Sequence, residues 1–347
     1  MEIEKLFSDI SSYVWGFPLI ILLIGGGLYL IIYSRFIPFK YFFHAIDIVR
    51  GKYDNSNDEG EISHFAALST ALSATVGMGN IAGVSVAISI GGPGAIFWMW
   101  VSGIIGMSTK FFTSSLAIMF RGKDSAGNIQ GGPMYFITEG LGKKWKALAV
   151  FFSICGLIGA LPVFNVNQLK QAINDILLIP MGYEVGLQSN LLIGLLLIII
   201  TSIVILGGLK RISAVASKLV PFMVLVYMIS VIAIIIINIE ELPYYIKLIF
   251  YDAFTALNYR GDSVTGGVLG SLIVLGIRRG AFSNEAGIGM APMAHGAAKT
   301  NSPIREGLVA MLGPAIDTLF VCTLTALAIL ITGVWETDLN GVTLTAA

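Results

Sequence analysis

Five stretches of this chain contain no Asp, Glu, Lys or Arg over at least the ~20 residues that an α-helix needs to cross a bilayer. They are Ile10 to Ser34, Phe65 to Thr109, Ala147 to Leu169, Val185 to Leu209 and Leu219 to Ile239. Charged residues make up 12% of the chain, about half the usual share of a soluble domain. Because a backbone in lipid must satisfy its own hydrogen bonds, these runs predict an all-α polytopic membrane protein.

Glycine and proline positions divide the apolar sequence into about eight expected spans. A lead helix is expected over 13–34, followed by spans over 66–90, 95–120, 147–168, 190–208, 217–238, 264–297 and 304–332. A short helix is expected over 133–141, and an amphipathic, aromatic helix over 240–257 that lies at the interface or packs over the mouth of the protein. All of these belong to one transmembrane domain, residues 1–347.

The basic residues predict the orientation of the chain. If the N-terminus is extracellular, the inner loops hold fourteen Lys and Arg residues and the outer segments four. This asymmetry fits the rule that cytoplasmic loops of membrane proteins are rich in Lys and Arg. We therefore expect a multi-pass protein of the cell membrane with its N-terminus outside.

The sequence "SATVGMGN", residues 73–80, interrupts the second span. Gly77 and Gly79 each weaken a helix by roughly 1 kcal/mol relative to Ala. Unwound backbone in a membrane persists where it lines a cavity or holds a ligand, so a break at Thr75–Gly79 predicts a binding site. The amides that begin the second half-helix suit a carboxylate, and the carbonyls that end the first suit a small cation, to which Asn80 adds an oxygen.

A second broken span strengthens this interpretation. A lone Gly-x-Gly also permits close helix packing, but "GAFSNEAGIGMAPMAHG", residues 280–296, again combines Asn, Gly-x-Gly and polar side chains. The two segments are five spans apart and therefore run in opposite directions. Paired interrupted helices of this kind indicate the binding site of a secondary transporter.

Four motifs resemble the alanine or glycine:cation symporters: "ALSATVGMGNIAGV" (71–84), "GGPGAIFWMWVSGIIGMSTKF" (91–111), "GGPMYFITEGLG" (131–142) and "RGAFSNEAGIGMAPMAHGAAKT" (279–300). The resemblance implies a five-plus-five inverted-repeat fold with one extra N-terminal helix. Residues 66–238 would form the first repeat and 264–332 the start of the second. It also implies uptake of alanine or glycine coupled to sodium, or to protons in some members.

The resemblance further implies roles for single residues. The amides of Gly77, Met78 and Gly79 would hold the substrate carboxylate, with Gln168, Phe282 and Ser283 also at the substrate. Thr75, Asn80, Ser283 and Asn284 would ligate one sodium ion, and the carbonyls of Ser73 and Val76 would face a second. Phe282 is alternatively a packing residue, and Gln168 alternatively a solvated cap near a loop.

Two possible roles remain open for each of two further polar residues. Glu285 is either functional or the partner of Arg278 or Arg279, and Asp317 either serves a cation or caps a helix kinked after Gly313-Pro314. His295 is expected at the interface rather than in a proton relay. Cys155 and Cys322 are expected to be packing residues.

The resemblance also implies that the last three helices of the ten-helix core are absent, so the chain is either a fragment or a truncated product. The rival function is a truncated, non-transporting paralogue or an amino acid sensor of the same fold. Three His and two scattered Cys offer no catalytic cluster, so an enzyme is not expected. The expected partners are a small amino acid and the bilayer, with no nucleic acid, and the protein is expected to be a monomer.

Overall fold

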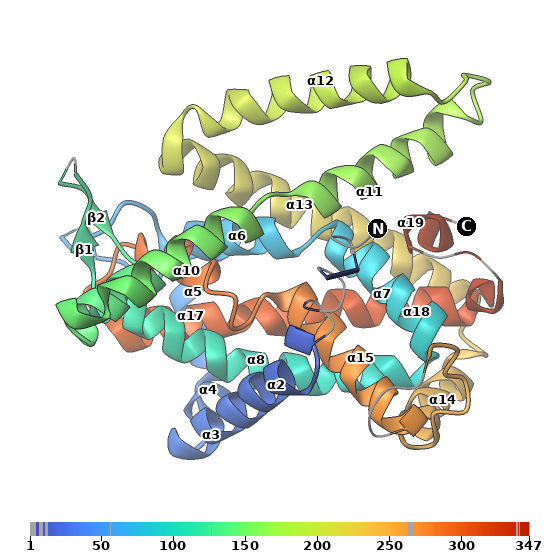
Figure 1. Ribbon diagram of the computed structural model, residues 1–347, viewed down its shortest axis with the longest axis horizontal. Helices are drawn as coiled ribbons and strands as arrows, with labels where there is room; N and C mark the ends of the chain where they lie inside the picture. The colour runs from blue at the N-terminus through green and yellow to red at the C-terminus, as the bar shows by residue number, and fades with distance from the viewer. Residues whose placement is uncertain are drawn as a thin grey trace.

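The computed structural model describes residues 5–6, 10, 13–55, 57–125, 127–262, 267–337, 339 and 341–346. These residues are almost entirely helical (Figure 1), with one antiparallel pair of short strands, β1 (Gly122–Lys123) and β2 (Ile129–Gln130). The all-α architecture predicted from the apolar runs is confirmed. The start of the expected 264–297 span, residues 264–266, lies outside the described residues.

The lead helix is continuous over residues 17–33 and comprises α2 (Phe17–Ile20), a π-helical turn η1 (Ile21–Gly25) and α3 (Gly26–Tyr33). Two short helices follow it, α4 (Ile37–Lys40) and α5 (Phe42–Val49). Ala45 and Ile48 of α5 are fully buried in a cluster with residues of α17 (Pro303–Pro314). This helix was not predicted, because its eight residues form a short run between the basic residues Lys40 and Arg50, a segment that reads as a loop.

The first broken span consists of α6 (His64–Thr75) and α7 (Met78–Gly91), whose axes are bent by 42°. The chain then reverses at Gly92, with a left-handed φ of +68°, into the long helix α8 (Gly94–Met119). Helix α8 crosses the centre of the molecule between α15 (Gly267–Asn284) and α17 (Figure 1). The expected division of the Phe65–Thr109 run at Gly91–Gly94 is confirmed.

The next segment differs from the prediction. Helix α9 (Pro133–Tyr135) and η2 (Phe136–Gly140) form the expected short helix, and η3 (Lys143–Trp145) leads into α10 (Lys146–Gly159). The expected span 147–168 is not continuous, because Pro162 removes a donor and disfavours helix at Leu161. The chain resumes in α11 (Val163–Ile173) and η4 (Asn174–Leu178). Cys155 lies on the exposed face of α10, so its expected packing role is wrong, whereas Cys322 is buried as expected.

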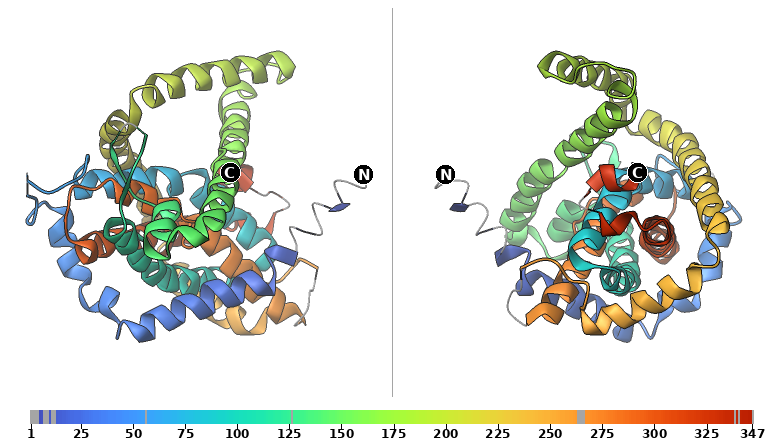
Figure 2. Two further views of the ribbon diagram at one scale, coloured as in Figure 1. Left: turned by 60° about the vertical axis from the view of Figure 1, so that its left-hand side comes forward. Right: turned by 90° about the vertical axis from the view of Figure 1, so that its right-hand side faces the viewer.

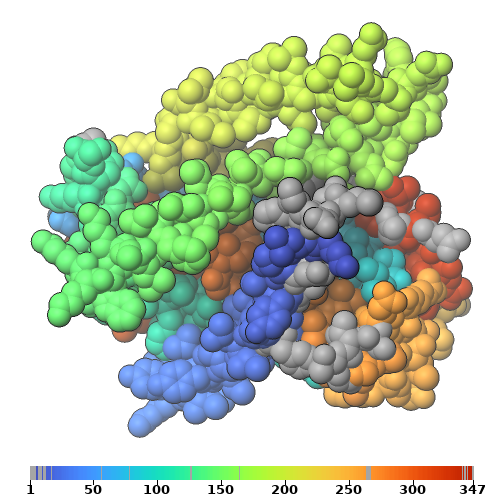
Figure 3. Space-filling view, in the orientation of Figure 1, coloured from blue at the N-terminus to red at the C-terminus, as the bar shows by residue number. Residues whose placement is uncertain are grey.

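Helices α12 (Leu187–Ile205) and α13 (Gly208–Ile237) match the spans expected over 190–208 and 217–238, with α13 starting earlier. Helix α12 arches away from the other helices (Figure 2), and the space-filling view shows an opening beneath it (Figure 3). Its exposed side chains are Leu and Ile residues, for example Leu192 and Ile198. Such a surface is suited to contact with lipid or another apolar helix.

The amphipathic segment forms α14 (Leu242–Thr255), which packs over the start of α8. Asp252 is fully buried and accepts hydrogen bonds from the amide of Gly94 (2.8 Å) and from Asn258. The indole of Trp98 donates to the Ala253 carbonyl (2.9 Å). Because Asp252 satisfies an amide at the start of α8, it fastens the amphipathic helix to the centre of the fold.

The last part of the chain contains the second broken span, α15 and α16 (Ala291–Gly296), unwound over residues 285–290. Helix α17, a π-helical segment η5 (Ala315–Cys322) and α18 (Thr323–Ile331) then form one continuous span, as expected for 304–332. Short helices η6 (Val334–Glu336) and α19 (Gly341–Ala346) follow, and α19 packs on α7 and α11.

Four described helices are long and apolar enough to cross a membrane: Gly94–Met119, Leu187–Ile205, Gly208–Ile237 and Pro303–Ile331. The bent pair α6 and α7 makes a fifth if it is one span. The polytopic class is confirmed, whereas the number of eight and the inverted repeat stay predictions. The remaining expected spans are shorter or interrupted, as in the lead helix and in α10 with α11.

Candidate substrate and cation site

The first unwound segment lies where the glycines predict it. Helix α6 ends at Thr75, Val76 and Gly77 are extended, and α7 begins at Met78. The amides of Asn80 and Ile81 both donate to the Gly77 carbonyl (3.1 and 3.2 Å). The first amides of a helix have no acceptor within it, so those of Met78 and Gly79 are free to meet an anion.

The second unwound segment has a left-handed backbone at three positions. Gly287 and Gly289 have φ of +95° and +94°, which glycine adopts without penalty, and Glu285 has φ of +52°. The Asn284 side chain accepts a hydrogen bond from the amide of Ala286 (2.9 Å) and donates to Thr318 Oγ1 (3.1 Å). The Asn284 side chain therefore stabilises the break by bonding both to the unwound segment itself and to the neighbouring π-helix η5.

Asp317 of η5 joins the two broken helices. Its carboxylate accepts hydrogen bonds from Asn80 Nδ2 of α7, from Ser283 Oγ of α15 (3.0 Å) and from Thr318 Oγ1 (3.0 Å). Asn80 Nδ2 also contacts the Asp317 carbonyl (3.3 Å). Asp317 is fully buried. Of the two alternatives for this residue, its contacts favour a place at the site over a helix cap.

A cavity of about 180 Å³ lies between the two breaks. Its lining includes the predicted residues Ser73, Thr75, Val76, Gly77, Gly79, Phe282 and Ser283. Sites for drug-sized ligands measure roughly 300–1,000 Å³, so this cavity suits a much smaller molecule. Backbone amides and carbonyls of the breaks make it polar on one side, and Phe282 makes it apolar on the other.

Three further predicted residues, Asn80, Asn284 and Gln168, lie outside this lining. Asn80 and Asn284 are fully buried behind it, against Asp317 and Thr318. Gln168 lies on α11 near Gly341 of α19, and its Oε1 is buried without a hydrogen-bond partner among the described residues. The buried Oε1 contradicts the solvated-cap alternative.

Two residues near the site, Asn165 and Lys110, were missed, and for Glu285 one of the two alternatives is favoured. Asn165 lines the cavity and lies one helical turn before Gln168, so the same polar stretch contained the signal. Glu285 also lines the cavity, and no ion pair joins it to Arg278 or Arg279 in the described part of the chain. Lys110 of α8 is buried, lies against Gly313 and interacts electrostatically with Asp317 and Glu285.

A second cavity, of about 460 Å³, adjoins the first at Phe282. Trp15, Ile90, Leu275, Arg278 and Arg279 complete its lining, and the Arg278 guanidinium lies 5.9 Å from the centre of the Trp15 ring. Because Phe282 contributes to both cavities, its ring separates the small polar pocket from the larger one.

His295 is 1% exposed and contacts the buried carboxylate of Glu306, and its position at the membrane interface stays a prediction. Glu306 is 11 residues from His295 and 242 residues from its second partner, His64, and local sequence patterns do not mark contacts over such separations.

The sequence of this chain is similar to those of known proteins. The profile of the Sodium:alanine symporter family matches residues 1–347. An uncharacterized transporter of Haemophilus influenzae is 42% identical over 352 residues, covering 99% of this chain and 74% of that protein. The sodium/alanine symporter AgcS of Methanococcus maripaludis is 40% identical over 353 residues (100% and 76%), and the amino-acid carrier protein AlsT of Bacillus subtilis 36% over 324 residues (92% and 65%). The chain therefore belongs to the sodium:alanine symporter family.

Proposed function

We propose that this protein takes up alanine, glycine or a similarly small amino acid together with sodium ions. The observation that carries the proposal is the position of Asp317, a buried carboxylate hydrogen-bonded to both broken helices beside a cavity of about 180 Å³. Buried acids within membrane segments are costly and mark ion pathways. The sodium/alanine activity named for the relative AgcS supports the same function.

The substrate would bind between the two breaks. Its carboxylate would meet the amides at the start of α7, at Gly77, Met78 and Gly79, where the helix dipole is positive; the Gly77 amide, which donates to Asn80 Oδ1 (3.3 Å), would have to exchange that acceptor for the substrate. Its side chain would point to Phe282, which lines the same cavity. Ser283 and Gln168 complete the substrate-binding residues of the proposal.

The first sodium ion would bind at Asp317. The carbonyl of Thr75 and the side chains of Asn80, Ser283 and Asn284 supply further oxygens, which are the ligands that unwound helices offer to sodium. The carbonyls of Ser73 and Val76 would face the second ion. Without a cation, the carboxylate of Asp317 accepts hydrogen bonds from Asn80 and Ser283. It is also attracted by the positive charge of Lys110. A proton is the alternative coupling ion.

Transport would proceed by alternating access around α6–α7 and α15–α16, in a monomer that spans the cell membrane with its N-terminus outside. A ligand shifts such an equilibrium only by its difference in affinity between the two states. Because Asp317 contacts both broken helices, cation binding there is able to favour one arrangement of the two over the other.

Uptake of radiolabelled alanine into proteoliposomes, with and without an inward sodium gradient, tests the proposal. Sodium-dependent uptake should be present in the wild type and lost in Asn80→Ala. Ser89→Ala is the matched control, because Ser89 lies on the same helix and bonds only to the Val86 carbonyl within it (3.2 Å). Alanine binding without sodium-driven uptake would overturn the transporter and favour the amino acid sensor.

A further inference from the structure

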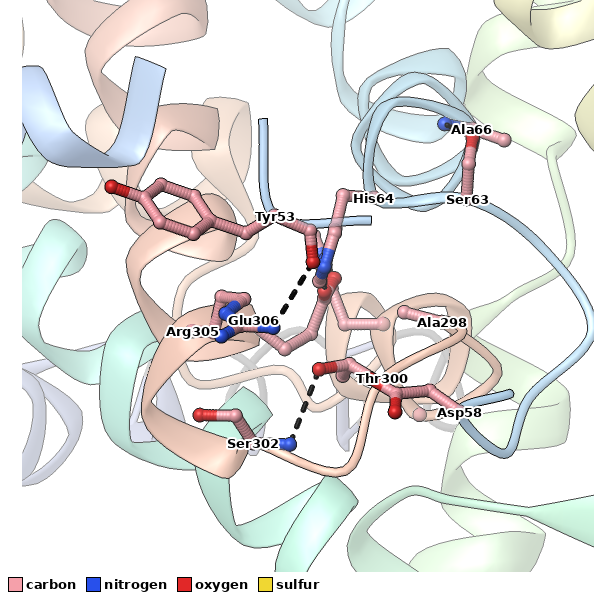
Figure 4. Close-up of polar contacts among 12 residues, drawn as sticks. Tyr53, Asp58, Ser63, His64, Ala66, Ala298, Thr300, Ser302, Arg305 and Glu306 are labelled. Atoms are coloured by element: carbon pink, nitrogen blue, oxygen red, sulfur yellow. Dashed lines mark hydrogen bonds and ion pairs between the residues drawn. The ribbon is translucent and has the colours of Figure 1, made fainter. Parts of the chain in front are cut away.

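Three ionisable side chains from three elements meet in the interior, outside the lining of the candidate site. They are His64, the first residue of α6, His295 of α16 and Glu306 of α17, each at most 1% exposed. Figure 4 shows His64 beside Glu306. We call them the His–Glu–His cluster. None of them lines the substrate cavity, so the proposed transport site leaves their burial unexplained.

The contacts of the cluster specify where its protons lie. His64 Nδ1 contacts one carboxylate oxygen of Glu306, and His295 Nδ1 lies 2.5 Å from the other. An ionised carboxylate only accepts hydrogen bonds, so both Nδ1 atoms carry hydrogen. His64 Nε2 is buried and has no hydrogen-bond partner in the described part of the chain. A second proton on His64 would therefore be buried without an acceptor, which is unfavourable.

The cluster is part of a larger set of contacts that joins the two broken helices. The segment before α6 pairs with the segment after α16: Glu61 N donates to the Ala297 carbonyl (2.8 Å) and Lys299 N to the Ile62 carbonyl (2.7 Å). Arg121, just beyond α8, donates to the carbonyls of Gly296 (2.8 Å), Ala298, Thr300 (2.9 Å) and Glu59 (3.2 Å). These contacts join the inner halves of both broken helices on the side that the basic loops predict to be cytoplasmic.

Other charges surround the cluster. Burial lowers the pKa of the Arg121 guanidinium below its ordinary value, and the charges of Glu306 and Glu59 oppose this effect. Arg305, beside Glu306, donates to the Tyr53 carbonyl (3.2 Å), as Figure 4 shows. Other ionisable groups on the packed elements are Asp58 and Glu61 before α6, His44 and Asp47 of α5, Lys299 after α16, Lys110 of α8, and Lys210, Arg211 and Lys218 of α13, which packs on α6. Arg121 and Arg305 both disfavour additional positive charge on the histidines.

We propose that the His–Glu–His cluster is a proton-binding site that latches the inner face of the protein, separate from the cation site at Asp317. In the latched state both histidines donate from Nδ1 to Glu306, and His64 is neutral, with no hydrogen on Nε2. Unlatching exposes His64 Nε2 to water, and this nitrogen then takes a proton from the inner solution. Because the proton binds the unlatched state better, acidification of the inner side opens the latch. The role of the latch as an inner gate rests on the proposed transport function; its proton chemistry does not.

Nitrogen-15 NMR of the histidine-labelled chain in lipid nanodiscs tests the proton positions directly. The chain has three histidines, so His44 serves as an internal reference. We expect His64 and His295 to carry hydrogen on Nδ1 at neutral pH. In Glu306→Gln, the amide offers one acceptor and one donor, so one histidine should change tautomer. An Nε2–H tautomer at His64 in the wild type would overturn the proposal.

Cysteine labelling tests the release of the latch. In a Cys155→Ser background, Ala297→Cys places a thiol at a position that is 2% exposed, and Lys123→Cys places one on the exposed hairpin. Both are labelled with a maleimide on opened vesicles, and the ratio of the two rates cancels the pH dependence of thiol reactivity. The ratio should rise several-fold on acidification, and this rise should vanish in His64→Gln, which keeps a donor for Glu306 but does not titrate.

An unchanged ratio in the parent, or an equal rise in His64→Gln, would refute the latch. Neither measurement needs sodium or an amino acid. A ratio that responds to pH in a protein that takes up no alanine would therefore uphold the proton site and reject the transport proposal. Sodium-dependent uptake together with a labelling ratio that does not change with pH would uphold the transport proposal and reject the proton site.

Discussion

Asp317 is the residue on which the proposed cation site depends. Asp317→Asn keeps the size of the side chain but removes the charge, and its amide would oppose the donor of Asn80. We expect sodium-dependent uptake to need a sodium concentration at least about tenfold higher, which corresponds to ~1.4 kcal/mol of binding free energy. The measurement is initial uptake rate against sodium concentration.

The matched control for this change is Asp47→Asn. Asp47 forms an exposed ion pair with Lys52 (3.2 Å), and exposed pairs contribute little. Its sodium dependence should equal that of the wild type. An Asp317→Asn protein with wild-type sodium dependence would place the cation elsewhere.

Phe282 separates the two cavities, and its ring should set the size limit for the substrate. In Phe282→Ala, the pocket of about 180 Å³ opens into the cavity of about 460 Å³, so larger amino acids should fit. Leucine and methionine should then compete with labelled alanine, which they should not do in the wild type. Phe320→Ala is the control, because that ring is 44% exposed on the outside of η5. Unaltered competition in Phe282→Ala would show that packing is the only role of the ring.

Residues that the sequence identifies have a local signature, whereas residues that it misses depend on partners far away in the chain. Gly77, Gly79 and Asn80 were identified because an unwound segment has a local signature of glycines and an amide in an apolar run. Lys110 and the His–Glu–His cluster were missed because their burial depends on partners from other helices, such as Gly313 against Lys110. No periodic pattern marks such contacts.

At the scale of the element, the break between α15 and α16 depends on Gly289. Its φ is +94°, and an added Cβ would lie 2.7 Å from the Phe152 ring and 2.9 Å from Pro133. Gly182 has a similar φ of +81° but open space around it. Both Ala substitutions should lose about 1–2 kcal/mol from the left-handed backbone, and Gly289→Ala a further ~1–3 kcal/mol from crowding. Thermal unfolding in detergent should show the lower Tm for Gly289→Ala; equal Tm values would mean that the crowding is relieved elsewhere.

Continuity of the helices was predicted less well than their existence. Both broken spans were expected from Gly-x-Gly motifs, but the interruption at Pro162 was not, although proline gives a local reason for it. The π-helical segment η5 directly follows Pro314, whose missing amide permits a changed hydrogen-bond register. This register sets the direction of Asp317, which the apolar composition of the span does not reveal.

At the scale of the whole molecule, the packed helices form a closed core to which α12 is loosely attached. Helix α8 contributes Met99 to one buried cluster, with α14 and α18, and Phe111 to another, with α5, α6 and α17. The site at Asp317 belongs to the span that joins both clusters. A change in the relative position of the clusters would therefore alter the contacts between Asn80, Ser283 and Asp317, as alternating access requires.

The orientation of the whole molecule is open to a direct test. The distribution of basic residues predicts that the loop between α11 and α12 is outside and the β1–β2 hairpin inside. In a Cys155→Ser background, Glu184→Cys should react with an impermeant maleimide on intact cells, and Lys123→Cys only after permeabilisation; both positions are exposed. The reverse labelling pattern would show that the protein has the opposite orientation in the membrane. The His–Glu–His cluster would then face the outer solution, and the cavity that contains Arg278 and Arg279 would become the exit of the transport path.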